Sequence, residues 1–333
     1  MTRALGAIVL AIVLIGALAA PALAPNSVAA RFGDFLFAPP MRPHLVDDEG
    51  KWRMPFVYRL LLVNRLESSY LEDRDHPIPL QWFAHGKLVN VPASANMPLL
   101  LLGGDSAGRD VFGRLLYGAR ASLGLAALAA FGALLIGVAV GGIAGFSGGP
   151  VDETLMALTE FIVVLPAIYL ILALRAAMPL VIESSTVFVL ISGIMALVGW
   201  PFVARGVRAI VAGERRREYA VAAESLGAGR VRVLGRHLLP ACKGFLAVQT
   251  TLLIPAFILA EATLSFVGLG FADPVSSWGT MLHDASNVSV FVDFPWMLSP
   301  AAAIFLVVLS INLIVQSTGA LPVSAGLSGR QPR

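Results

Sequence analysis

Residues 213–243 read GERRREYAVAAESLGAGRVRVLGRHLLPACK, and they form the one long polar stretch in the second half of the chain. Hydrophobic runs long enough to cross a bilayer lie on both sides of it. We therefore interpret this stretch as a segment in water that connects two membrane helices. The surrounding chain is then expected to consist mainly of membrane helices.

The polar stretch carries a helical pattern with a small apolar face. Four of its residues fall at positions i, i+3, i+4 and i+7: Tyr219, Ala222, Ala223 and Leu226. Gly227 predicts a helix stop, because glycine tolerates the positive φ common just after a helix. A second short helix, with Arg232 and Arg236 on one side, is expected to end or kink at Pro240, which lacks an N–H. The pattern predicts helix, glycine turn and helix, an element suited to docking in a groove of a partner protein.

The composition is that of an integral membrane protein. Mean hydropathy is +0.79, and 14% of residues are charged, against about 25% in soluble domains. Cys242 is the single cysteine, which excludes an intramolecular disulfide and a cysteine-cluster metal site. His44, His76 and His85 are irregularly spaced, so we expect no metal site. The net charge of +3 gives no indication of nucleic-acid binding.

The sequence contains no nucleotide-binding loop. Such a loop needs Gly-Lys followed by Ser or Thr. Among the three lysines only Lys51 and Lys87 follow a glycine, and the next residues are Trp52 and Leu88. The chain is therefore not expected to hydrolyse ATP, and an ATP-driven process would need another subunit to bind the nucleotide.

Hydropathy predicts an all-α integral membrane protein with about six transmembrane helices. Their expected ranges are 4–24, 121–146, 154–178, 185–211, 245–270 and 297–314. Pro166 is expected to kink the third span, and the Gly- and Ala-rich second span to pack closely on its neighbours. The first run could instead be a signal peptide cleaved after Ala24, but its length and Pro25 favour an uncleaved span.

The predicted domain organisation follows from these spans. Residues 1–24 form the first helix, and 25–120 a long extracytoplasmic loop, expected to be a small folded layer with short strands. Residues 121–320 form the membrane core with the polar segment 213–243, and 321–333 a cytoplasmic tail.

Basic residues predict the orientation of the chain. Nine Lys and Arg lie between residues 205 and 243, whereas the connection 271–295 has none. Short cytoplasmic loops are enriched in basic residues. The polar segment and both termini are therefore expected in the cytoplasm, and the long first loop outside.

Two acidic residues lie inside predicted spans. Glu160 is close to one end of its span, where it could pair or reach the interface, and Glu261 lies deeper. Intramembrane acids are functional candidates. We expect Glu261 to lie close to a substrate pathway or at a contact between helices.

Four stretches together resemble a known family. They are GDSAGRDVFGRLLYGARASL at 104–123, AGFSGGPVDE at 144–153, the polar segment at 213–243, and EATLSFVGLG with SWGTML at 261–270 and 277–282. The chain resembles the permease subunits of binding-protein-dependent ABC importers, in the dipeptide, oligopeptide and nickel branch, and specifically the C-type subunit. The similarity extends over about residues 102–312.

The resemblance implies half of a translocation pathway in a bacterial inner membrane. It implies a homologous second permease subunit, two cytoplasmic ATPase subunits that carry ATP and Mg, and an external solute-binding protein, with no cofactor in this chain. The polar segment corresponds to the coupling loop, called the EAA loop, that contacts an ATPase. Carried over by position, its residues are Glu218, Tyr219, Ala222, Ala223, Glu224, Gly227, Arg232, Leu239 and Pro240.

Within the EAA segment one residue departs from the motif, and alternatives to the importer remain open. Val221 stands where the EAA motif has its glutamate, which leaves Glu218 and Glu224 as the carboxylates of this segment. The alternatives are a secondary transporter or channel not driven by ATP, and a scaffold whose basic loop binds anionic lipid. The solute also stays open among peptides, other amine-bearing molecules and nickel complexes.

Overall fold

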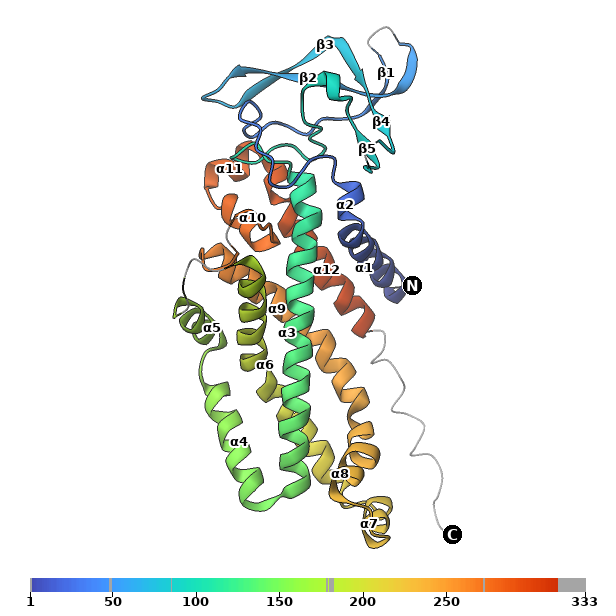
Figure 1. The fold of residues 1–333 in the computed structure, drawn as a ribbon, viewed down its shortest axis with the longest axis vertical. Coiled ribbons are helices and arrows are strands. Elements are labelled where there is room, and N and C mark those ends of the chain that lie inside the picture. The colour runs from blue at the N-terminus through green and yellow to red at the C-terminus, as the bar shows by residue number, and fades with distance from the viewer. Residues whose placement is uncertain are drawn as a thin grey trace, which may run out of the picture.

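The computed structural model describes residues 2–47, 50–84, 86–177, 179, 183–271 and 273–316. Figure 1 shows a strand-containing layer at one end of the long axis, a helical bundle in the middle and helix α7 at the other end. The helices are α1 (Thr2–Leu18), α2 (Ala20–Leu23), α3 (Val111–Ser147), α4 (Gly149–Val164), α5 (Ala167–Ala176), α6 (Ser184–Glu214), α7 (Glu218–Ser225), α8 (Arg230–Arg232), α9 (Lys243–Phe266), α10 (Trp278–Asp284), α11 (Val288–Asp293) and α12 (Ser299–Gln316).

Fewer helices than expected are long and apolar enough to cross a membrane. In the described part of the chain they number four, or five if α4 and α5 count as one span. The four are Val111–Ser147, Ser184–Glu214, Arg230–Phe266 and Pro295–Val315. Helix α1 is shorter and packs along α12, where a Cβ on Gly6 would lie 2.7 Å from the carbonyl oxygen of Ser310. Among the described residues, length and composition therefore identify four or five of the six expected spans, and α1 is too short to meet the same criterion.

Helices α3 and α6 form the centre of the bundle. A Cβ on Gly137 would lie 2.5 Å from Val203 Cβ, and one on Gly141 would lie 2.3 Å from the carbonyl oxygen of Ala204. These glycines are four residues apart and share one face of α3. Their missing side chains allow the two backbones to approach as closely as they do.

The prolines of the membrane spans differ in whether they interrupt a helix. Pro166 lies between α4 and α5, and the two helices differ in direction by 86°, so the expected kink is a complete break. Pro201 and Pro255 lie inside α6 and α9 without interrupting them. The third span is therefore a bent pair of helices.

The expectation of an all-α chain is wrong for the layer that precedes α3. Strands β1 (His44–Val46), β2 (Trp52–Asn64) and β3 (Ser69–Pro79) form an antiparallel sheet in that order, and β4 (Gln81–Trp82) pairs with β5 (Val89–Asn90). Residues of the layer bury a small core of their own: Ala38, Met41, Val57, Leu60, Leu80, Val89, Val91, Leu99 and Leu100. Backbone pairing between strands and this core make the long first loop a folded layer. Short strands were expected there, but β2 and β3 are 13 and 11 residues long.

The element boundaries differ from prediction at two further places. Helix α3 begins at Val111, ten residues before the predicted span, because the Asp110 side chain accepts a hydrogen bond from the N–H of Phe112 and caps the helix. After α8 the chain continues through a π-helical turn (Val233–Leu238) and a 3-10 turn (Leu239–Cys242) into α9. Pro240 therefore does not end a helix. It lies in the first positions of the 3-10 turn, where a missing N–H leaves no hydrogen bond unmade.

Candidate functional site

Helix α7 is exposed at the end of the molecule farthest from the strand layer (Figure 1). Its fully buried residue is Ala220, and Ala223 is half-buried. Tyr219, Val221 and Leu226 turn outward, with exposed fractions of 43%, 52% and 88%. Tyr219, Ala222 and Leu226 share one face of the helix, whereas Val221 lies on another. The shared face is a candidate contact surface for a partner protein.

Gly227 makes the predicted turn after α7. Its φ is +83°, and nothing lies within 4 Å of the position that a Cβ would take. The N–H of Ala228 donates to the carbonyl of Ala223 and that of Gly227 to the carbonyl of Glu224, both at 3.0 Å. Glycine is thus required here by backbone conformation and not by lack of space. The predicted helix stop is confirmed.

Arginines attach α7 to the long helices. The guanidinium of Arg215 donates to the carbonyl of Phe146 at the end of α3, and lies 4.6 Å from the centre of the Phe146 ring. Its Nε also lies 3.7 Å from Glu224 Oε1 on α7. The Tyr219 hydroxyl donates to Glu214 Oε2 at 2.6 Å, and this bond together with burial raises the pKa of Tyr219. These contacts connect α7 to the ends of α3 and α6.

The structure groups most of the predicted coupling residues at this tip. Glu218, Ala222 and Glu224 are exposed on α7. Tyr219 on the same helix and Gly227 just after it are exposed as well. Arg232 is exposed one turn further on. Leu239 and Pro240 lie apart from α7, in the 3-10 turn that leads into α9, and Leu239 is half-buried.

The two predicted intramembrane acids have different surroundings. Glu261 is fully buried where α3, α9 and α10 meet, and its carboxylate accepts from the hydroxyls of Ser122 (2.8 Å) and Ser265 (2.7 Å). Ser122 Oγ in turn accepts from the backbone N–H of Trp278 at 3.1 Å. Glu160 is exposed on α4. Glu261 therefore lies at a contact between helices.

A charged cluster next to the outer layer was not predicted from the sequence. Arg109 contacts three carboxylates: Nε to Asp105 Oδ2 (2.7 Å), Nη1 to Asp273 Oδ1 (2.7 Å) and Nη2 to Asp284 Oδ2 (3.0 Å). Arg114 Nη1 contacts the same Asp284 at 2.8 Å, and also Asp105. Burial alone would lower the pKa of Arg109, but the carboxylates raise it above its usual value. The sequence carried one signal of this cluster: the connection 271–295 contains aspartates but no Lys or Arg, so these carboxylates need basic partners from elsewhere in the chain.

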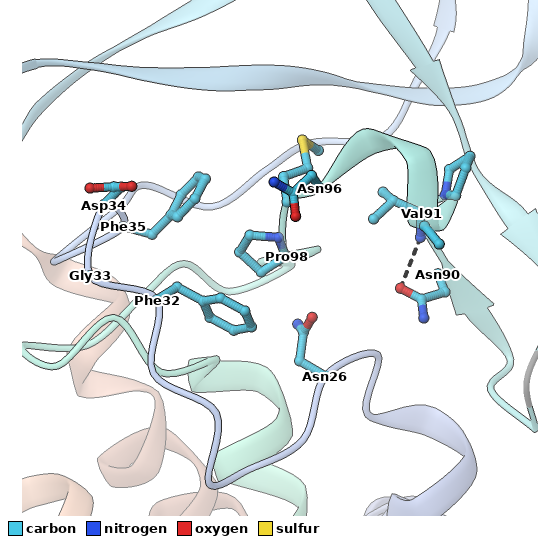
Figure 2. A pocket seen from close by; sticks show the side chains of 12 residues that line it. Asn26, Phe32, Gly33, Asp34, Phe35, Asn90, Val91, Asn96 and Pro98 are labelled. Carbon is cyan, nitrogen blue, oxygen red and sulfur yellow. Dashed lines mark hydrogen bonds between the residues drawn. The ribbon is translucent and has the colours of Figure 1, made fainter.

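The outer layer also forms an open pocket of about 420 Å³, shown in Figure 2. Phe32, Asn26 and Pro98 face its interior in that view. Asn26 Nδ2 donates to the carbonyl of Leu99 (2.7 Å) and to Asp110 Oδ2 (3.1 Å), which connects the pocket wall to the cap of α3. Burial raises the pKa of Asp110 to about 6, although the hydrogen bonds that its carboxylate accepts from Asn26, Gly113 and Phe112 lower it.

The two histidines that the structure describes in this layer, His44 and His76, have protein partners. His44 packs against the rings of Phe56 and Tyr58, and His76 Nδ1 lies 3.2 Å from Asp73 Oδ2. His85 lies outside the described residues. Within the ranges that the structure describes, no three His, Cys, Asp or Glu side chains come together in a way that could hold a metal ion.

Comparison with known proteins gives concordant matches. Residues 137–320 match the family model for the binding-protein-dependent transport system inner membrane component. The chain is 36% identical over 213 residues to the oligopeptide transport system permease protein OppC of Bacillus subtilis, covering 64% of this chain and 67% of the relative. It is 36% identical over 225 residues to the dipeptide transport system permease protein DppC of the same organism, covering 68% of each. It is 35% identical over 213 residues to the nickel transport system permease protein NikC of Escherichia coli, covering 64% of this chain and 74% of the relative.

Proposed function

Because this chain belongs to the family of binding-protein-dependent transport system inner membrane components, we propose that it forms half of the translocation pathway of an ATP-driven importer of peptides. The membership confirms the resemblance predicted from the sequence. The chain is a multi-pass permease component of an ABC importer and is not itself an enzyme.

The complete transporter that we propose contains a homologous second permease, two cytoplasmic ATPase subunits and an external solute-binding protein. ATP and Mg bind the ATPase subunits, in keeping with the absence of a Gly-Lys-Ser or Gly-Lys-Thr sequence in this chain. No cofactor is assigned to the permease itself. The peptide substrate is supported by relatives whose names specify oligopeptide and dipeptide transport.

Helix α7 is the proposed contact with an ATPase subunit. The observation that carries this assignment is the exposed face of α7 that Tyr219 and Ala222 share with Leu226, beside the Gly227 turn. Arg215 and Glu224 attach that surface to the long helices, so closure of the ATPases would displace α3 and α6. Val221 is exposed on a different side of α7, where an apolar side chain stands in place of the carboxylate of the family motif.

The proposed membrane topology has six crossings, with α1 as the first and the bent pair α4 and α5 as the third. Both termini and α7 lie in the cytoplasm, and the strand layer lies outside, where it meets the solute-binding protein. The basic residues between 205 and 243 support this orientation. The predicted tail at 321–333 lies outside the described residues.

Reconstitution of the complete transporter in proteoliposomes tests this function. We expect uptake of a short peptide that requires ATP inside the vesicle and the solute-binding protein on the outside. Uptake that persists without ATP and follows an ion gradient would instead identify a secondary transporter. Purification of the intact chain with no bound ATPase subunit would also contradict the proposal.

A further inference from the structure

A second pocket lies inside the membrane part of the molecule, between α5, α6 and α9, with a volume of about 550 Å³. Most of its lining is apolar, with Ile171 from α5, Phe202 from α6, and Leu252 and Phe257 from α9. Residues 249, 252, 253, 256, 257 and 260 of α9 all line it, at the spacing of a single helix face. The volume is in the range of small-molecule sites.

The polar residues of this pocket gather at one end. Arg205 lies in the last third of α6 and Gln249 in the first third of α9, and both line the pocket. These two helix ends are the ones that the segment containing α7 connects. Val198 and Ala260 line the pocket nearer the opposite ends of the same helices. The pocket therefore has a cationic end towards α7 and an apolar remainder.

Arg205 differs from the other arginines of this region. Arg208, three residues along α6, contacts Asp152 with Nε at 2.9 Å, and Arg215 contacts Glu224. Arg175 on α5 donates to the carbonyl of Leu269 at 2.9 Å. Over the residues that the structure describes, Arg205 makes no ion pair and no side-chain hydrogen bond, and it is exposed. A charged side chain within a membrane helix usually faces a bundle interior or a substrate pathway.

We propose that this pocket is a transient binding site on the translocation pathway for solutes that combine a carboxylate with an apolar body, such as the C-terminal end of a short peptide. The guanidinium of Arg205 presents a planar set of donors that matches a carboxylate, and the Gln249 amide supplies a further donor. Apolar side chains of the solute lie against Phe202, Leu252 and Phe257. This inference rests on the proposed function and names the chemistry that its pathway recognises.

Binding of two matched peptides to the purified complex of both permeases and both ATPases, without the solute-binding protein, tests the site. The probes are trileucine and trileucine amide, which differ in the C-terminal carboxylate. We expect Arg205→Gln to weaken trileucine binding about tenfold or more, because a charge-assisted hydrogen bond is lost. Trileucine amide should bind the variant and the natural complex within a factor of two. Arg205→Lys should retain part of the preference for trileucine.

Arg120→Gln is the matched control, because Arg120 is exposed on α3 and does not line this pocket. It should leave the binding of both peptides unchanged. Equal binding of the two peptides to the natural complex would overturn the proposal, as would an equal loss of both in Arg205→Gln. The proposal would also be overturned if Arg205→Gln left trileucine binding unchanged while the complex lost its second permease or its copurified anionic phospholipid. Arg205 would then pair with that subunit or lipid. The measurement needs no ATP turnover, so its failure is distinct from a failure of ATP-driven uptake.

Discussion

Arg109 and Asp284 are separated by 175 residues in sequence, and Nη2 of the arginine donates to Oδ2 of the aspartate at 3.0 Å. The contact joins the segment that leads into α3 to the last residue of α10. Asp105 and Arg114 complete the cluster from the α3 side, both buried. The segment that leads into α3 and the connection between α9 and α12 are therefore held together by charge, with Asp105, Arg109 and Arg114 buried and Asp273 and Asp284 partly exposed.

Removal of Arg109 should destabilise the outer end of the bundle. Arg109→Ala leaves Asp105 buried beside a single remaining arginine, and breaking a buried ion pair typically costs about 3–5 kcal/mol. The measurement is the free energy of unfolding, or the midpoint of thermal unfolding, of the detergent-purified chain. Arg31→Ala is the control, because Arg31 meets Asp273 at an exposed site, where such pairs contribute about 0–1 kcal/mol. Equal effects of the two substitutions would contradict a structural role for the cluster.

Gly227→Val should uncouple ATP hydrolysis from uptake. The φ of +83° at Gly227 is strongly disfavoured for a β-branched residue, so the turn after α7 would change its path. Gly229→Val is the matched control, because Gly229 has a φ of −63° and open space around it. ATPase activity and peptide uptake are measured together in the reconstituted transporter. Coupled transport at the natural ratio in a correctly inserted Gly227→Val variant would argue against docking through this turn.

Replacement of Glu261 should loosen the contact between α3, α9 and α10. Glu261→Ala opens a cavity and leaves the hydroxyls of Ser122 and Ser265 without their acceptor, at about 1–3 kcal/mol for each buried polar group left unpaired. Glu261→Gln keeps the volume and one acceptor oxygen, so a smaller loss of thermal stability is expected. If Glu261→Ala altered neither thermal stability nor transport, the assigned structural role would be wrong.

Stability of the outer end should depend on the protonation of Asp110. Its pKa is about 6 in the folded chain, against an ordinary value of 3.8 for an aspartate in water, so the folded state binds the proton more tightly. The resulting stabilisation is complete below about pH 4 and is lost as the pH rises through 6, with a total of about 3 kcal/mol.

The Asp110→Asn variant separates this contribution from those of other titrating groups. Asparagine is also a good N-cap, so α3 is expected to begin at the same residue. The difference in unfolding free energy between the natural chain and the variant should change between about pH 4 and about pH 6.5 and stay nearly constant above that range. A difference that is independent of pH would show that Asp110 does not titrate in this interval.

Features encoded by neighbouring residues were predictable from the sequence. Hydrophobic runs located the long helices, Pro166 located the break in the third span, and Gly227 located the turn after α7. Each depends on local backbone preference or on the length of an apolar run, which are properties of a single segment. The family resemblance rests on the same local motifs, and the positions carried over from it place most coupling residues at one exposed tip.

What the tertiary structure decided is which segments meet. The pairing of Arg109 with Asp284, and the enclosure of Glu261 by Ser122 and Ser265, join parts of the chain whose approach depends on the packing of α3, α9 and α10. The continuation of the helix past Pro240 and the strands of the outer layer likewise depend on hydrogen bonds and burial that local preference does not specify. Sequence by itself determined the long apolar segments, the break at Pro166 and the turn at Gly227, because these follow from local conformational energy. Tertiary structure decided the partners of the buried charges. A buried charge is destabilising unless an opposite charge lies beside it, and here that charge comes from a distant element packed against it.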